Sequence, residues 1–221
     1  MTTKQSDCKN TDEIDFKNHW NTAYTKNTTE KLGWYEQSSA QTIQLIKASK
    51  VSKNAKILNI GVGSSMLIDE LLEDDYTHLI ANDLSAKAIE NLQERLGKQA
   101  SKITCIVDDV IHPEKLQNLQ SVDVWNDRAT LHFFLKEEEQ HAYFKLLKQL
   151  VSVDGFIIIA VFALDGAEKC CGLPLQRYDV AGLQEKLGTD FSLIESFNYT
   201  FMNPYGGERP YIYTLFKRKS K

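Results

Sequence analysis

Gly61, Gly63 and Asp83 have residue types and a spacing that suit the binding of a ribose. A β-rich apolar run leads directly into Gly61-Val62-Gly63, and a helix-like stretch over 66–72 follows. Glycine permits a tight turn with positive φ and lets the backbone approach a ligand closely. Asp83 ends the next apolar run, 22 residues after Gly61, which is about the distance along the chain at which a carboxylate meets the ribose hydroxyls of an adenosine ligand. The two stretches together predict a site for an adenosine-bearing cofactor.

This glycine turn departs from the dinucleotide-binding pattern, because Met66 stands where a third glycine is expected. Ser64 or Ser65 is placed to cap the helix that follows. Asp83 has an alternative role as the N-cap of the next helix, although Ser85 can perform that capping instead. We therefore predict that Asp83 binds the ribose, because the glycine turn and this acid occur together at the expected spacing.

Cys170 and Cys171 are a second group with chemical potential, because adjacent thiols after a predicted strand suit a soft acceptor, a thiol partner or a metalloid. The alternative is that they only pack the loop. The five histidines have no zinc-like spacing with any cysteine pair, so we predict no metal site.

The elements that position these residues alternate between strand and helix. A helix with apolar residues Ile14, Phe16, Trp20 and Tyr24 is expected first, capped by Thr11 or Asp12. Further expected strands cover 103–107, 122–127 and 156–162, the last after a turn at 154–155, and helices cover 38–50, 84–96, 136–151 and 180–187. Residues 191–202 and 209–218 are expected to be strands joined by a Pro/Gly turn at 203–207.

Composition describes an ordinary α/β chain. Of the 221 residues, 42% are hydrophobic and 25% charged, and the net charge of −4 gives no electrostatic reason to expect nucleic-acid binding. The longest apolar run, 156–164, is too short to span a membrane, and the first residues do not resemble a signal peptide. Four cysteines without a disulfide pattern suit the cytoplasm. We expect a disordered lead-in over 1–11 and a single domain over 12–221, whose first part, 12–50, forms a helical lid.

Five strand–helix alternations followed by a β-rich pair resemble the class I S-adenosylmethionine-dependent methyltransferases over roughly 12–217. The resemblance implies a Rossmann-like three-layer α/β/α sandwich, with a seven-stranded, mostly parallel sheet and a C-terminal antiparallel β-hairpin. It also implies S-adenosyl-L-methionine as the cofactor. The family's acid-x-Gly-x-Gly turn is matched with Asn59 in place of the acid, so the position keeps a hydrogen-bond acceptor but loses the charge. The implied cofactor-binding residues are Trp20, Trp34, Asn59, Gly61, Gly63, Asp83, Leu84, Asp109, Val110 and Asn126.

The resemblance implies that Asp83, with Leu84 beside it, binds the ribose. Asp109 and the amide of Val110 recognise the adenine, with Asp108 as a rival, and Asn126 lies beside the methionine moiety.

Three local likenesses point to different substrates. The segment 125–129 resembles the Asp-Arg exit of the fourth strand in thiopurine methyltransferases. The aromatic segments around Trp20 and Trp34 are similar to those of small methyltransferase-like lysine methyltransferases, and they either close over the cofactor or pack as a hydrophobic lid. The segment 168–178 resembles uncharacterised bacterial methyltransferases.

Methyl transfer from a sulfonium is an in-line displacement that depends mainly on alignment, and it needs a base only when the nucleophile arrives protonated. The candidate catalytic residues are Asp127, Arg128 and His132. Asp127 is expected to position cofactor or substrate, or to pair with Arg128 as a structural carboxylate. Arg128 is a candidate holder of an anionic substrate, and His132 is a candidate base or a packing residue.

The function predicted from these observations is methyl transfer to a small-molecule acceptor by a monomer that binds neither nucleic acid nor membrane. A protein lysine methyltransferase is the alternative within the same chemistry. An NAD-binding oxidoreductase, or a catalytically silent cofactor-binding domain, is the alternative outside it.

Overall fold

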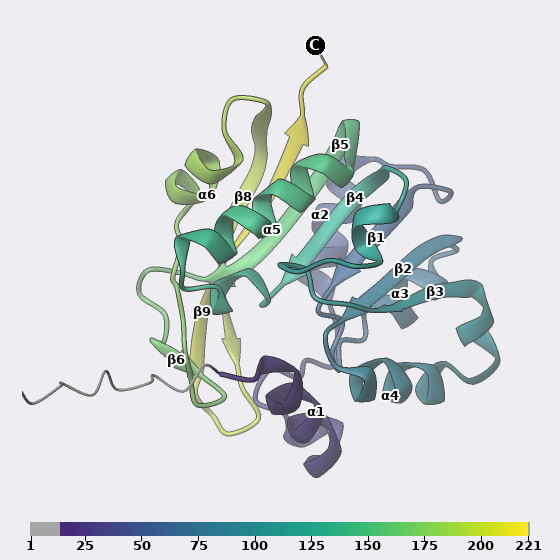
Figure 1. Ribbon diagram of the computed structural model, residues 1–221, viewed down its shortest axis with the longest axis vertical. Helices are drawn as coiled ribbons and strands as arrows, with labels where there is room; N and C mark the ends of the chain where they lie inside the picture. Colours follow the sequence, from purple (N-terminus) through teal and green to yellow (C-terminus); the bar gives the residue numbers. More distant parts are fainter. Residues whose placement is uncertain (1–13, 221) are drawn as a thin grey trace, which may run out of the picture.

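The protein folds around a seven-stranded sheet in the order β3-β2-β1-β4-β5-β9-β8. A computed structural model describes residues 14–220. The first five strands in this order run parallel, and β9 runs antiparallel to both of its neighbours. Figure 1 shows helices on both faces of the twisted sheet, which confirms the predicted fold class. The strands are β1 (Lys56–Ile60), β2 (His78–Asp83), β3 (Ile103–Val107), β4 (Val122–Arg128), β5 (Val151–Phe162), β8 (Phe191–Met202) and β9 (Glu208–Arg218).

Two hydrophobic cores lie on opposite faces of this sheet. In β5 alternate residues separate between them, since Ile157 and Ile159 belong to one core while Ile158 and Ala160 belong to the other. This alternation follows from the two-residue period of a strand, and a continuous apolar run is what a strand buried on both faces requires. One core includes side chains of α5 (Glu137–Leu150) and α6 (Val180–Leu187), and the other those of α2 (Ala40–Ser49), α3 (Leu67–Glu73) and α4 (Ala86–Leu96).

The strand order creates a switch point between β1 and β4. The chain moves outward from β1 to β2 and β3, then returns to add β4 on the other side of β1. In open α/β sheets, ligands bind in the crevice at the carboxyl ends of the strands at such a point. Figure 1 shows α1 (Phe16–Lys26) beyond these strand ends.

The helix ends follow capping rules, with one correction. Ser85 caps α4 by accepting a hydrogen bond from the Ala88 amide, and Gly97 ends that helix, both as predicted. In contrast, α1 begins at Phe16 and is capped by Asp15, whose carboxylate accepts from the Asn18 amide at 2.9 Å. The predicted caps Thr11 and Asp12, like the predicted lead-in 1–11, lie outside the described residues.

Two other expectations near β5 were wrong. The predicted turn at 154–155 lies inside β5, where Asp154 adopts φ +63° and the pairing with β4 shifts register as a bulge. The segment expected to be a loop contains a small hairpin of β6 (Lys169–Cys170) and β7 (Leu173–Pro174). The C-terminal hairpin of β8 and β9 is confirmed.

Short 3₁₀ helices complete the described chain: η1 (Thr29–Lys31), η2 (Gly97–Lys102), η3 (Leu116–Asn118) and η4 (Leu131–Phe133). Among residues 14–220, no helix has the length and apolar character needed to cross a membrane.

Candidate active site

The glycine turn after β1 is required for both backbone and steric reasons. Gly61 has φ +61°, and a Cβ there would stand 2.1 Å from Thr130 Oγ1. Gly63 has φ +47°, and a Cβ there would stand 2.5 Å from Tyr24 Oη. At both positions a larger residue is therefore disfavoured by the positive φ and also by the lack of space for a Cβ. The turn lies directly beneath Tyr24 of α1 and Thr130, the residue before η4.

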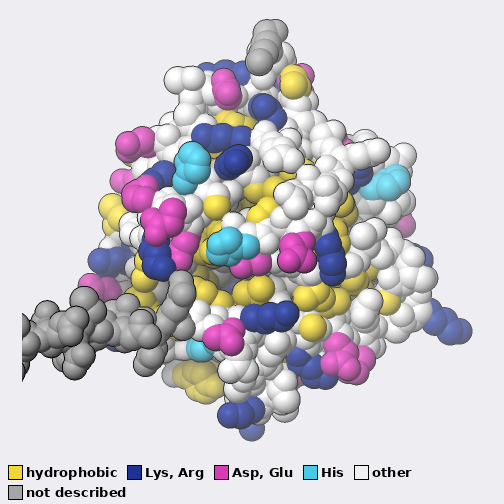
Figure 2. All heavy atoms as spheres, viewed as in Figure 1, with side chains coloured by type: hydrophobic (Ala, Val, Ile, Leu, Met, Phe, Trp, Pro, Cys, Tyr) yellow, Lys and Arg dark blue, Asp and Glu magenta, His cyan; other side chains and the backbone are white. Residues whose placement is uncertain are grey.

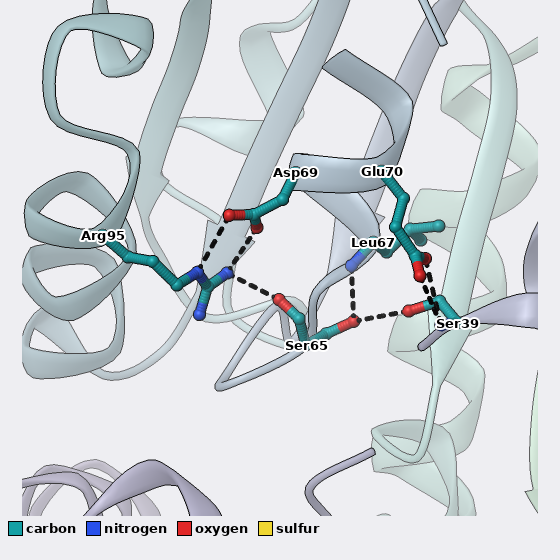
Figure 3. Close-up of polar contacts among 6 residues, drawn as sticks. All are labelled: Ser39, Ser65, Leu67, Asp69, Glu70 and Arg95. Carbon is teal, nitrogen blue, oxygen red and sulfur yellow. Dashed lines mark hydrogen bonds and ion pairs between the residues drawn. The ribbon is translucent and has the colours of Figure 1, made fainter. Parts of the chain in front are cut away.

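A polar network that begins at the pocket lining, at Ser65, holds this turn, as Figure 3 shows. Arg95 of α4 donates to both carboxylate oxygens of Asp69, at 3.1 and 2.7 Å, and to the Ser65 carbonyl at 2.7 Å. Ser65 Oγ accepts from the Leu67 amide at 3.2 Å. The N-cap of α3 is nevertheless Met66, without a side-chain cap hydrogen bond, so the predicted cap at Ser64 or Ser65 was wrong. Bidentate arginine–carboxylate geometry is directional, and it holds the turn rigid against α4.

Asp83 lies at the end of β2 with its carboxylate against the glycine turn. Its oxygens accept from the Gly63 amide at 2.9 Å and from the Ser85 amide at 2.8 Å. Burial raises the pKa of Asp83 to about 6, and these amide donors offset part of that effect. Asp83 and Leu84 both line the large pocket over the strand ends, where the ribose role of Asp83 was predicted.

The structure separates the two acids after β3. Asp108 is buried and accepts from the amides of Glu114, Lys115 and Leu116, so its carboxylate holds the following loop. Asp109 is more exposed, and it accepts from the Ile111 amide at 2.9 Å. Both acids, together with Val110, line the pocket. Because the Asp108 carboxylate already accepts hydrogen bonds from three backbone amides, Asp109 is the better candidate for ligand recognition.

Asn59 is paired with Asn126 across β1 and β4. The Asn126 side-chain amide donates to Asn59 Oδ1 at 3.0 Å, and the Asn59 amide donates to the Ile80 carbonyl at 3.4 Å. Asn126 Oδ1 is buried in the pocket lining without a hydrogen-bond partner. A buried acceptor without a partner is costly unless a ligand completes it. The free acceptor predicted at Asn59 is therefore provided by Asn126.

Asp127 is a correction to the candidate catalytic residues. Its side chain is fully buried outside the pocket lining. It accepts from the amides of Thr130 and Leu131 at 2.8 and 3.0 Å, and from the Tyr143 hydroxyl at 2.7 Å. Burial raises the pKa of Asp127 to about 6. Asp127 thus fixes the exit of β4 through Thr130, Leu131 and Tyr143, and the predicted pair with Arg128 does not form.

Arg128 pairs instead with Glu36, a residue that the sequence analysis did not select. Arg128 Nη2 lies 2.6 Å from Glu36 Oε2, and Nη1 donates to the Trp34 carbonyl at 2.9 Å. The guanidinium also lies over the rings of Phe201 and Tyr211. Because Glu36 compensates its charge, the prediction that Arg128 holds an anionic substrate is not supported. No local sequence pattern points to this pair, because its two residues lie far apart along the chain.

His132 is fully buried in the pocket lining, and neither ring nitrogen has a hydrogen-bond partner. It packs against Phe133 and Phe162, with ring centroids 4.5 and 5.0 Å apart. Burial lowers the pKa of His132 to about 3, assisted by the charge of Arg128. The imidazole is therefore neutral at pH 7 and is a poor general base, although it keeps a free donor and a free acceptor.

Aromatic rings from the N-terminal segment roof the pocket. Trp20 packs edge-on against Trp34 and Phe133, at centroid distances of 5.6 and 5.0 Å, and Tyr24 packs against Trp34 at 5.7 Å. Trp20, Tyr24, Trp34 and Phe133 all line the pocket. The helix predicted as a lid thus supplies the pocket's roof.

One pocket therefore joins nearly all the predicted residues, with Asp127 as the exception. Its half over β2 and β3 contains Asp83 and Asp109, and its half over β4 and β5 contains Arg128, His132 and the thiols of Cys170 and Cys171. Within residues 14–220 no cluster of three or more His, Cys, Asp or Glu side chains is arranged to hold a metal ion. Figure 2 shows hydrophobic side chains across the middle of one face, between α5 and α1, with charges of both signs scattered around them.

The comparisons with known proteins agree with this geometry. Residues 57–155, from β1 into β5, match the methyltransferase domain family. A zebrafish (Danio rerio) protein, EEF1A lysine methyltransferase 2, is 29% identical over 157 residues, which cover 65% of this chain and 66% of that protein. Residues 57–155 are therefore similar to a methyltransferase domain, and the chain has the fold of an S-adenosylmethionine-dependent methyltransferase.

Solved structures confirm the fold. A S-adenosylmethionine-dependent methyltransferase from Anabaena variabilis superposes with a TM-score of 0.73 at 13% identity, over 92% of this chain and 93% of that one. A structure from work on the conversion of a disulfide bond into a thioacetal group during echinomycin biosynthesis gives 0.74 at 15% identity, with the same coverage. The match over 57–155 is to a methyltransferase domain, which favours the methyltransferase over the NAD-binding oxidoreductase. The match to the zebrafish protein spans slightly less than two thirds of its length.

Proposed function

We propose that the protein transfers a methyl group from S-adenosyl-L-methionine to a small-molecule acceptor. The observation that carries this proposal is a single pocket in which the glycine turn and Asp83 adjoin an aromatic-roofed space over β4 and β5. As part of the proposal, the enzyme acts as a cytoplasmic monomer.

The residues present suit the cofactor. Asp83 would bind the ribose hydroxyls, Asp109 and the Val110 amide the adenine, and Asn126 Oδ1 the methionine amine. The strongest support is Asn126, because its buried oxygen lacks a partner at the position where an ammonium donor is expected. When bound, the cofactor supplies a methyl group on a positively charged sulfur. Trp20 and Trp34 then act as a lid that excludes water and aligns the nucleophile.

The acceptor half of the pocket contains no evident general base. Asp127 is sealed away, Glu36 is engaged by Arg128, and the lowered pKa of His132 leaves that ring unable to hold a proton near pH 7. An acceptor must therefore arrive with a lone pair already available. A nitrogen heterocycle or a thiolate meets this requirement, and the unpartnered nitrogens of His132 are placed to hydrogen-bond such a ligand.

A protein lysine is the second candidate acceptor, because the zebrafish relative is an EEF1A lysine methyltransferase. A free lysine amine has a pKa of about 10.4, so it must lose a proton before it attacks. The pocket would have to favour the neutral amine by desolvation among the aromatic rings. The lack of a base makes this acceptor less well supported than a heterocycle.

Radiolabelled S-adenosylmethionine distinguishes these acceptors. The protein is incubated with a panel of nitrogen heterocycles and small thiols, and separately with EEF1A. We expect label in small-molecule products, loss of transfer with Gly63→Ala, and retention with Gly188→Ala as the matched control. Label in EEF1A lysines alone would replace the small-molecule proposal. Absence of both methylated product and S-adenosylhomocysteine would support a catalytically silent domain.

A further inference from the structure

The hairpin of β6 and β7 presents two adjacent thiols to the pocket. Its two-residue turn consists of Cys171 with φ +55° and Gly172 with φ +80°. Turns with two positive φ values strongly favour Asn-Gly or Gly-Gly, and a left-handed cysteine costs about 1 kcal/mol. Both Cys170 and Cys171 line the pocket beside Arg128 and Tyr211. A strained residue at a pocket edge suggests a functional constraint on its side chain.

The two sulfur atoms are separated by 3.5 Å, and neither cysteine is in a disulfide. Thiolate sulfurs lie about 2.3 Å from a shared soft centre, so this separation corresponds to an angle of about 100° at that centre. Such an angle suits a pyramidal centre with a lone pair better than a tetrahedral metal ion. Zinc also requires four ligands, whereas the described residues offer no third protein ligand here.

The electrostatic surroundings favour sulfur ligation. The pKa of Cys170 is lowered, chiefly by the hydrogen bond with the Cys171 thiol and further by Arg209 and Arg128. The thiolate is the form of cysteine that bonds to soft centres, so Cys170 is the first sulfur to react. The Cys171 thiol, whose pKa is raised, follows and releases its proton.

We propose that Cys170 and Cys171 together bind a trivalent arsenical, which keeps one substituent of its own as the third ligand. With arsenous acid, two As–O bonds break and two As–S bonds form. The two thiol protons leave with the two hydroxides as water, and the oxidation state of arsenic does not change. This binding requires no methyl transfer, so it stands apart from the proposed function.

Phenylarsine oxide tests the site in the full chain, kept reduced with a phosphine. Intact mass spectrometry should show one phenylarsenic unit per chain, with two of the four cysteines protected from iodoacetamide. Cys170→Ser and Cys171→Ser should each abolish the protected pair, whereas Cys105→Ser, a half-buried thiol on β3, should retain it. Peptide mapping of the wild-type adduct should locate both As–S bonds at 170–171, a result that does not depend on the folding of any variant.

Binding by the folded hairpin should exceed binding by the same residues in an unfolded chain. We expect affinity to fall at least about ten-fold in denaturing urea, because the native turn holds the two sulfurs in place in advance. Equal affinities in the two states, an adduct mapped to other cysteines, or protection that survives Cys170→Ser would each overturn the proposal.

Discussion

The carboxyl ends of β2 and β4 carry the same sequence signal and use it differently. Asp83 is the last residue of β2 and Asp127 the last but one of β4. Each is buried, accepts hydrogen bonds from two backbone amides and has a pKa raised to about 6 by burial. Asp83 lies open to the pocket, whereas Asp127 is covered and takes a third donor from Tyr143. An acid at a strand end is therefore a ligand candidate only where the following segment leaves it uncovered.

The same contrast divides the pocket. In the half over β2 and β3, Asp83 is held by backbone amides of the glycine turn and of Ser85. The half over β4 and β5 depends on side chains brought from distant segments, such as Glu36 for Arg128. Substitutions that separate ligand binding from stability test this division between the two halves of the pocket.

Gly63→Ala should have the largest effect on cofactor binding. The new Cβ would lie 2.5 Å from Tyr24 Oη in a backbone with φ +47°. We expect the affinity for S-adenosylhomocysteine, measured by calorimetry, to fall at least about 100-fold, which is about 2.7 kcal/mol. Gly188→Ala is the matched control, since Gly188 has φ +78° with no atom within 4 Å of its Cβ position. Equal losses in both variants would show that backbone strain alone is responsible.

Asp127→Ala should reduce stability and leave ligand affinity unchanged. The substitution leaves two amides and the Tyr143 hydroxyl without their acceptor. We expect the free energy of unfolding to fall by about 3 kcal/mol, as measured by urea denaturation. A ligand affinity that drops more than the stability change explains would return Asp127 to the binding site.

Asp83→Ala should show the reverse pattern. A hydrogen bond to a charged group contributes about 1.5–3 kcal/mol, so we expect affinity for S-adenosylhomocysteine to fall about ten- to 100-fold. The loss of stability should be smaller than for Asp127→Ala, because water in the pocket can satisfy the exposed donors. Unchanged affinity would remove Asp83 from the ribose site.

The pH dependence of ligand affinity should show the smallest effect, and it tests the ionisation of Asp83 specifically. Because the pKa of Asp83 is about 6, binding should be constant above pH 6 and should weaken by about ten-fold per unit below it, as the carboxylate protonates. Titration by calorimetry between pH 5 and 8 measures this, and Asp83→Asn should abolish the dependence. An equally steep profile in that variant would assign the titration to another group.

Loss of binding at low pH should not come from unfolding through these two acids. Their folded-state pKa values, about 6, lie above the ordinary aspartate value of 3.8. The folded state therefore binds more protons than the unfolded state between these values, and the contribution of both acids to stability rises as the pH falls from 6 toward 4.

Sequence alone predicted the features that depend on local patterns. The continuous apolar runs predicted the central strands, and Ser85 and Gly97 predicted the ends of α4, because capping requires only neighbouring residues. The β6–β7 hairpin was missed because Cys-Gly is an unusual turn pair. The Glu36–Arg128 pair and the burial of Asp127 were missed because both depend on tertiary contacts that no local pattern specifies.

Calorimetric titration of the wild-type protein with S-adenosylmethionine, S-adenosylhomocysteine and NAD tests the central claim most directly. We expect the two sulfur-containing ligands to bind with dissociation constants on the order of micromolar, about −8 kcal/mol, and NAD not to bind. Binding of NAD alone, or of no ligand at all, would contradict the assignment of this pocket to S-adenosylmethionine.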